Sequence, residues 1–171
     1  MNLQELVFNN FSFTAPFDIN HNNYQYHDNS AVQYTNPVLE AYKKYGIELH
    51  YEVQVNSSNG EVTIRLDCHT FPYAEFKNAD DYEKALKQRY SNNFADKIMD
   101  LRDKLKDLYI NIGKTSQDNY YYGKRNREDH LWLVYKIYNN ITDETQLMCE
   151  IYRFIADTYC DLLNNLSRLI Q

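Results

Sequence analysis

The sequence predicts an α+β fold, in which an antiparallel sheet of two hairpins, in the order ββα-ββα, carries long amphipathic helices on one face. Two observations support this prediction. Residues 47–55 and 61–69 alternate strictly between apolar and polar side chains on both sides of a turn that ends in Asn59-Gly60. Two long segments with the apolar spacing of a helix then follow, one after each expected hairpin.

The charges of the first hairpin select its register. One register sets Glu52 opposite Arg65 and His50 opposite Asp67, so that no like charges face each other. A tighter turn would shift one strand by two residues and set Glu52 against Asp67. We therefore expect the first register, closed by a four-residue loop in which Gly60 takes a positive φ.

Two helical segments flank this hairpin in the sequence. A helix is expected over residues 37–45, because Asn36 can cap its start and Gly46 can end it in a left-handed conformation. A long amphipathic helix is expected over residues 82–112. Residues 91–93, Ser-Asn-Asn, are its weak point, where we expect it to bend or split.

A second hairpin and a last helix complete the chain. Strands are expected over residues 118–122 and 130–138, separated by a charged turn at 123–129. A helix over residues 142–170 should begin at a capping box in which Gln146 reaches back to the first turn. In the last strand the expected faces are Leu131, Leu133, Tyr135 and Ile137 on one side and Trp132, Val134, Lys136 and Tyr138 on the other.

The domain organisation is expected to be simple. Residues 1–35 are rich in Asn, His and Tyr and are interpreted as an N-terminal arm and loop, while residues 36–171 form a single α+β domain. The net charge of −6 describes an acidic protein whose average field repels nucleic acid. Seventeen tyrosines raise the aromatic content to 15%, and tyrosine favours half-buried positions and interfaces.

Cysteine use and the ends of the chain indicate a cytoplasmic protein. Cys68, Cys149 and Cys160 form no CxxC pattern and lie in apolar surroundings, so reduced core thiols are expected. The start of the chain lacks the basic region of a secretory signal, and no apolar run is long enough to cross a bilayer. No membrane association is expected.

The polar face of the first hairpin is a candidate metal site. His50, Glu52, Asp67 and His69 all point to this face, and two imidazoles with carboxylates can hold a metal for hydrolysis of a phosphodiester. The alternative is a solvated face of alternating charge. The Lys that a restriction-type nuclease places two residues after a strand carboxylate is absent here.

The charged turn of the second hairpin is a candidate site for nucleic acid. Basic side chains follow aromatic ones, a combination that can hold phosphates and stack on unpaired bases. The alternative is a solvated hairpin tip, neutralised by Glu128-Asp129. The residues of this candidate site are Tyr121, Tyr122, Lys124, Arg125 and Arg127.

The last part of the chain resembles a known family in its layout. A charged helix ends near Ile112-Gly113, an aromatic hairpin ends in residues 131–135, and a helix over residues 150–170 closes the chain after a turn that contains Asp. Residues 86–171, about half of the chain, thereby resemble the uncharacterised α+β domain attached to restriction-type nucleases in bacteria and mobile elements. The resemblance implies an association with nuclease defence systems and supplies no catalytic residue.

The favoured function is therefore a non-enzymatic protein-binding module of bacterial or mobile-element origin, such as an inhibitor or accessory of a nuclease defence system. The Walker A, GxGxxG, GxSxG and HExxH patterns are absent from the sequence, and no cofactor is expected. The alternatives are a metal-dependent hydrolase or nuclease on the first hairpin and nucleic-acid binding at the basic turn. The partner, another protein or a second copy, is expected at Trp132, Tyr138, Leu166, Leu169 and Ile170.

Overall fold

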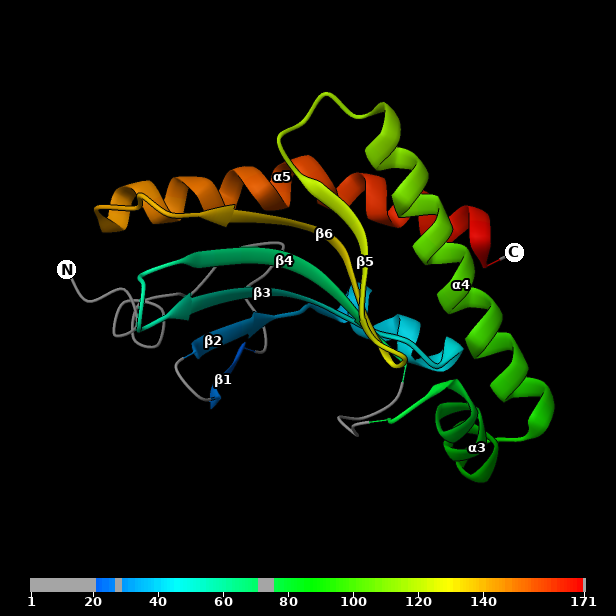
Figure 1. The fold of residues 1–171 in the computed structure, drawn as a ribbon. Helices are drawn as coiled ribbons and strands as arrows, with labels where there is room; N and C mark the ends of the chain where they lie inside the picture. The colour runs from blue at the N-terminus through cyan, green and yellow to red at the C-terminus, as the bar shows by residue number, and fades with distance from the viewer. Residues whose placement is uncertain (1–20, 27–28, 71–75, 171) are drawn as a thin grey trace.

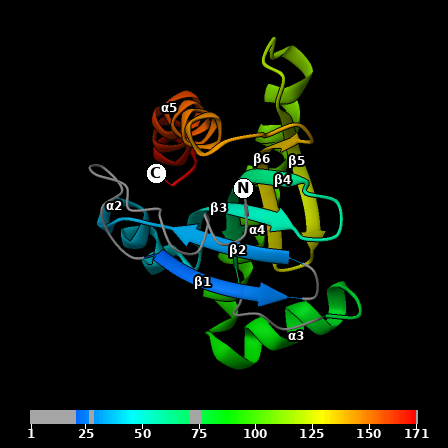
Figure 2. The same cartoon turned by 90° about the vertical axis from the view of Figure 1, so that its left-hand side faces the viewer.

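The described residues of the protein fold into one six-stranded antiparallel sheet covered by helices (Figure 1). The computed structural model describes residues 21–26, 29–70 and 76–170. The sheet has the order β1-β2-β3-β4-β6-β5, and Figure 2 shows β1, β2 and β3 side by side at one edge. The strands are β1 (His21–Tyr26), β2 (Asn29–Tyr34), β3 (Glu48–Asn56), β4 (Val62–His69), β5 (Tyr121–Arg127) and β6 (His130–Tyr138); the helices are α2 (Pro37–Glu40), the 3-10 helix η1 (Ala41–Tyr45), α3 (Ala79–Arg89), α4 (Asn92–Thr115) and α5 (Glu144–Leu169).

The α+β class is confirmed, but the sheet is larger than expected. Residues 21–26 and 29–34, interpreted from the sequence as loop, form β1 and β2, which pair with each other and extend the sheet beyond β3. Residues 1–20 and 27–28 of the expected N-terminal arm lie outside the described residues. Strand β1 has the sequence HNNYQY, which lacks alternation of apolar and polar residues, so only its pairing with β2 reveals it as a strand.

The main core lies between the sheet and helices α4 and α5. Tyr51 and Val53 from β3 and Ile64 from β4 are buried against the α5 residues Ile151 and Phe154. In Figure 1, α5 runs along one face of the sheet while α4 passes beside β5. A smaller core, consisting of Tyr82, Leu86, Ala95 and Ile98, joins α3 to α4.

The register expected for the first hairpin is confirmed. Glu52 pairs with Arg65 and His50 pairs with Asp67 across β3 and β4. The backbone N–H of Asn56 donates to the carbonyl of Glu61 at 2.9 Å and closes a four-residue loop. Gly60 in this loop has φ of 71°. Alternation of charge and the turn together therefore determined the pairing.

The expected helix boundaries are largely confirmed by their caps. The side chain of Asn36 accepts a hydrogen bond from the Leu39 N–H at the start of α2, although the second half of this helix is the 3-10 helix η1. The long helix splits at Ser91, whose side chain caps α4. At the start of α5, Asp143 accepts from the Gln146 N–H, and the Gln146 side chain accepts from the Thr142 N–H at 2.9 Å.

The second hairpin is longer than expected and its turn is shorter. Residues 123–127, interpreted as a charged turn, belong to β5, and the chain reverses at Glu128 and Asp129. Gly123, with φ of 70°, allows β5 to approach α4 so closely that a Cβ there would lie 2.4 Å from Cγ1 of Ile110. Pairing with β6, which the charged composition of this segment did not indicate, places these residues in the sheet.

A β-bulge at Leu133 corrects the expected faces of β6. Leu66 of β4 pairs with Val134 whereas Asp67 pairs with Trp132, so Leu133 is the extra residue. The bulge shifts the alternation by one residue in the second half of the strand. Residues 131, 133, 134, 136 and 138 consequently face the helices, while residues 130, 132, 135 and 137 face the other side.

Two of the three cysteines lie on the surface, where the sequence had predicted core positions. Cys68 is buried, but Cys149 and Cys160 on α5 are exposed, so the expectation of three core thiols is wrong for two of them.

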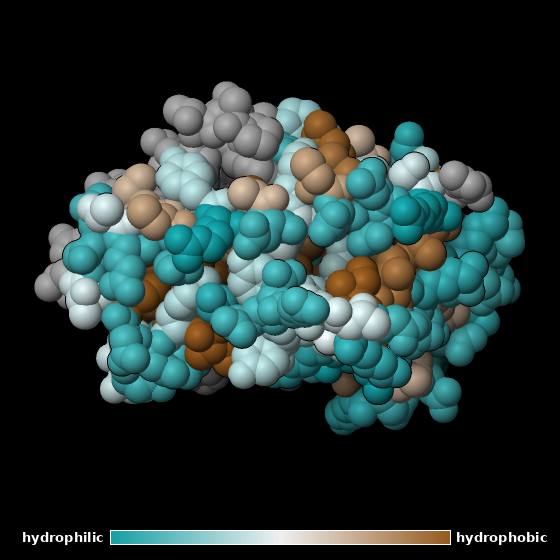
Figure 3. All heavy atoms as spheres, turned by 90° about the horizontal axis from the view of Figure 1, so that it is seen from above, coloured by the Kyte–Doolittle hydropathy of each residue, from teal (hydrophilic) through white to brown (hydrophobic). Residues whose placement is uncertain are grey.

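On the face seen from above in Figure 3, hydrophobic side chains form small separate areas among hydrophilic ones. Within the described residues, no helix has both the length and the apolar character that a membrane crossing needs.

Candidate functional site

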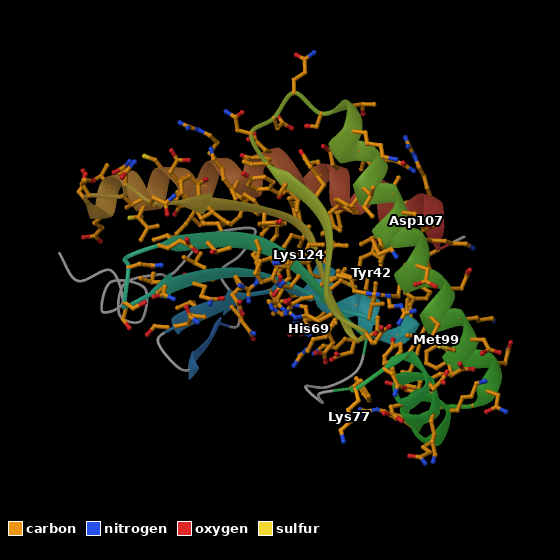
Figure 4. All side chains as sticks on the ribbon, in the orientation of Figure 1. Tyr42, His69, Lys77, Met99, Asp107 and Lys124 are labelled. Atoms are coloured by element: carbon orange, nitrogen blue, oxygen red, sulfur yellow. The ribbon has the colours of Figure 1, made fainter. Side chains whose placement is uncertain are left out.

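The sheet face opposite α5 carries a buried group of ionisable side chains, called the polar cluster below. Each of its members is at most 7% exposed, so the interpretation as a solvated face of alternating charge is wrong. Figure 4 shows His69 on the side of the sheet away from α5. The polar cluster consists of His50 and Glu52 from β3, Arg65, Asp67 and His69 from β4, and His130 from β6.

Arg65 joins the two carboxylates of the polar cluster. Its Nε lies 2.9 Å from both carboxylate oxygens of Asp67 and donates to them, while its Nη2 pairs with Glu52. The Gln54 side chain accepts from Nη1 of Arg65, and Gln33 donates to Glu52 at 3.1 Å. A buried guanidinium with such partners fixes the orientation of both carboxylates.

Three imidazoles surround the Asp67 carboxylate. Its Oδ2 lies 3.3 Å from Nε2 of His50, 3.2 Å from Nε2 of His130 and 4.0 Å from Nε2 of His69. The rings form a stack, with centroids 5.1 Å apart for His50 and His69 and 3.9 Å apart for His69 and His130. Imidazole nitrogens from three adjacent strands thus point at one carboxylate oxygen.

Electrostatics keep this carboxylate charged and one imidazole neutral. Burial by itself raises the pKa of Asp67, but attraction to Arg65 and the nearby imidazoles of His130 and His50 outweighs it and lowers the pKa well below its usual value. Burial lowers the pKa of His69 to about 2, helped by His130 and His50. The site therefore offers an anionic oxygen and a neutral nitrogen, both metal-ligating forms.

The candidate metal ligands expected from the sequence are brought together in part. His50, Asp67 and His69 each offer one donor atom within 4.8 Å of the other two. Glu52 lies 3.9 Å from His50 but is paired with Arg65, so it stands beside the three donors. His130 was missed, because its place in the polar cluster depends on the pairing of β6 with β4, which brings it opposite His69.

A second surface adjoins the polar cluster near the edge of the sheet and is called the aromatic surface below. It consists of Tyr121 and Lys124 from β5 and Trp132 and Tyr135 from β6. The rings of Tyr121 and Tyr135 stack with centroids 5.3 Å apart, and Tyr135 meets Trp132 edge-on at 5.2 Å. Lys124 places its Nζ 4.4 Å from the centroid of the Trp132 ring. Tyr121 is 58% exposed.

The expected nucleic-acid residues do not share one surface. Tyr121 and Lys124 lie on the aromatic surface, whereas the Tyr122 hydroxyl turns to the helix side and contacts Asp118 at 3.2 Å. Arg125 pairs with Glu128 and Arg127 pairs with Asp129, both at 3.5 Å. Two of the three expected phosphate-binding cations therefore lie beside carboxylates of the same hairpin.

The expected partner residues lie in half-buried or fully buried positions. Trp132 belongs to the aromatic surface, while Tyr138 faces the helices, where Lys136 lies 4.9 Å from its ring. Leu166 is completely buried in the main core, so the expectation that a partner reaches it is wrong. Leu169 and Ile170 are half-buried against the same core. Most of the apolar stripe of α5 is buried against the sheet.

A cavity of about 290 Å³ lies on the helix side of the sheet, apart from both sites. Its walls come from α4, α5 and β5 and include Tyr109, Tyr122, Asp157, Asp161 and Arg168. The Tyr120 hydroxyl donates a hydrogen bond to Asp157 at the margin of this cavity, over 2.7 Å.

Comparison of the chain with family models, curated proteins and solved structures finds no match.

Proposed function

We propose that this protein acts by binding another protein through the aromatic surface and has no catalytic activity of its own. The observation that supports the proposal is an exposed Tyr121 ring held in place by its stacking on Tyr135, next to Trp132. Rings that are already ordered lose little conformational entropy when a partner covers them, which is why Tyr and Trp dominate interface hot spots.

The charges near the aromatic surface favour a protein partner over nucleic acid. Lys124 is the basic residue of this surface, whereas Arg125 and Arg127 pair with carboxylates of the same hairpin. Nucleic-acid binding depends on several unpaired cations and on a favourable field, and the net charge of −6 opposes it. The partner should present apolar side chains to the rings and a carboxylate to Lys124.

The buried state of the polar cluster argues against the hydrolase alternative. A hydrolytic metal site needs an open position for water and substrate. His50, Asp67, His69 and His130 are each at most 7% exposed. A nuclease of a defence system is the partner class implied by the layout of residues 86–171, and we include it in the proposal.

The experiment compares native protein with Tyr121→Ala and Trp132→Ala in capture from the native host, followed by binding measurements with the purified partner. Tyr152→Ala is the matched control, because Tyr152 is an exposed tyrosine, 44% accessible, on α5. We expect each substitution in the aromatic surface to weaken binding about 10-fold or more and the control to leave it unchanged.

Two results would contradict the proposal. In the first, the purified partner binds Tyr121→Ala and Trp132→Ala as well as it binds native protein. In the second, native protein binds single-stranded DNA or RNA with a steep salt dependence that Tyr121→Ala abolishes, which would favour the nucleic-acid alternative.

A further inference from the structure

The polar cluster has the donors of a closed transition-metal site. His50, His69 and His130 direct their Nε2 atoms at one oxygen of Asp67 from three neighbouring strands. His50 lies directly opposite Asp67, and His69 lies directly opposite His130, so the register of the sheet itself holds the four side chains together. A site on paired strands is more rigid than one on loops.

Two distances at the Asp67 oxygen match those expected between neighbouring ligands of a tetrahedral ion. Metal bonds of about 2.0–2.1 Å in a tetrahedron place neighbouring ligand atoms about 3.3 Å apart. The Asp67 oxygen lies 3.3 Å from Nε2 of His50 and 3.2 Å from Nε2 of His130. The corresponding separation for His69 is 4.0 Å, and its ring is stacked on that of His130, so binding requires His69 to approach and rotate towards the ion.

The hydrogen-bonding state of the donors supports the same conclusion. The Nε2 atoms of His50 and His130 are buried and lie 3.3 and 3.2 Å from the same Asp67 oxygen, but at angles outside those of a regular hydrogen bond. A metal ion between this oxygen and the two nitrogens would satisfy all three buried atoms. The other nitrogen of His130 faces the Asn126 side chain at 3.2 Å, which can orient the ring as metal-bound imidazoles require.

The charge of the polar cluster also suits a cation. Two buried carboxylates, Glu52 and Asp67, share one buried guanidinium, that of Arg65. When the three imidazoles are in the neutral form that binds metals, a divalent ion beside Asp67 would offset the remaining negative charge, which is costly to bury. Arg65 would remain bonded to Asp67 and orient it, as partners of metal-ligating carboxylates do.

We propose that His50, Asp67, His69 and His130 bind one Zn²⁺ ion, or a similar divalent transition metal, in a buried structural site. Three imidazoles and a carboxylate select metals of this class over Mg²⁺ and Ca²⁺, which prefer oxygen ligands. With all four ligands contributed by the chain, the site has no open position for a substrate, so it stabilises the sheet. This proposal does not rest on the function proposed for the aromatic surface.

The test uses the full chain, freed of metal by a chelator and titrated with Zn²⁺ by calorimetry and with Co²⁺ by visible absorption. We expect one ion per chain, an apparent dissociation constant below about 1 µM and the absorption of tetrahedral Co²⁺. His69→Ala and His130→Ala should each weaken Zn²⁺ binding about 100-fold or more. The control Cys149→Ser with Cys160→Ser removes the exposed thiols and should change nothing.

A measurement on native protein covers the case in which the histidine variants do not fold. Zn²⁺ should shift the Nε2 resonances of the His50, His69 and His130 imidazoles in a nitrogen-detected spectrum, in proportion to the ion added up to one equivalent. Absence of Zn²⁺ binding overturns the proposal. Binding that persists in a folded His130→Ala, or that disappears in the cysteine control, overturns it as well.

Discussion

The guanidinium carbon of Arg65 lies 4.5 Å from the centroid of the Trp132 ring. The same side chain binds Glu52 and Asp67, so Arg65 touches both the polar cluster and the aromatic surface. Lys124 lies over the same ring at 4.4 Å. Trp132 is therefore held by two cations, and its orientation depends on a buried residue that a partner never touches.

Replacing Arg65 should destabilise the fold strongly. Arg65→Met removes the guanidinium but leaves Glu52 and Asp67 buried without their common partner, so we expect the free energy of unfolding to fall by about 3–5 kcal/mol. Urea denaturation measures this loss. The matched control is Arg153→Met, because Arg153 is 63% exposed and pairs with Glu150 on the surface of α5.

The control should lose less than about 1 kcal/mol, as exposed ion pairs contribute little. Equal losses in the two variants would show that the Arg65 network is not the stabilising element described here.

Two glycines with nearly the same backbone conformation allow strain and clash to be separated. Gly60 has φ of 71° and no atom within 4 Å of a built Cβ, so Gly60→Ala should cost about 1–2 kcal/mol from the left-handed conformation alone. Gly123 has φ of 70°, but its Cβ would lie 2.4 Å from Cγ1 of Ile110 and 2.8 Å from its backbone nitrogen.

Gly123→Ala should therefore reduce the free energy of unfolding by at least about 1 kcal/mol more than Gly60→Ala, because β5 must move away from α4. Thermal or urea unfolding of the two variants, side by side with native protein, measures the difference. A smaller loss for Gly123→Ala would mean that β5 and α4 are not in close contact.

Tyr82 should make the protein sensitive to alkaline pH. Burial raises its pKa to about 12, and the hydrogen bond with Thr70 and the attraction to Arg102 offset only part of that increase. In the unfolded chain the phenol ionises near about pH 10. The stabilisation from neutral Tyr82 is thus complete below about pH 10 and is lost as the pH rises towards about 12.

Urea unfolding at about pH 8 and at about pH 11 measures this loss, which should be of the order of 1–2 kcal/mol for Tyr82. Tyr82→Phe serves as the comparison, since it keeps the ring and removes the ionisable hydroxyl. The advantage of native protein over Tyr82→Phe should shrink at the higher pH. An unchanged difference would show that Tyr82 ionises alike in both states.

The first hairpin was predictable because its information is local. Residues 47–55 and 61–69 carry their own alternation and turn, and the charge pairs Glu52 with Arg65 and His50 with Asp67 decide the register. The burial of its polar face was not predictable in the same way. Alternation tells which residues share a face, but not whether another part of the chain covers that face.

The missed parts of the candidate sites depend on contacts between distant segments. His130 reaches the polar cluster only because β6 pairs with β4, and a bulge such as that at Leu133 has no distinctive residue type. Strand β1 is visible only through its pairing with β2. Cys149 and Cys160 were expected in the core because helical spacing is ambiguous at the border of a wide apolar stripe.

The extra residue at Leu133 lets one strand serve two environments. Before the bulge, His130 of β6 lies in the buried polar cluster. After the bulge, Tyr135 of the same strand lies beside the exposed Tyr121. If the same residues paired without a bulge, strict alternation would turn Val134 to the other face of the sheet and Tyr135 towards the helices. Deletion of Leu133, in contrast, would restore regular alternation and keep Tyr135 on the face of Trp132, so the loss of this codon during evolution would remove one core side chain and leave the aromatic surface in place.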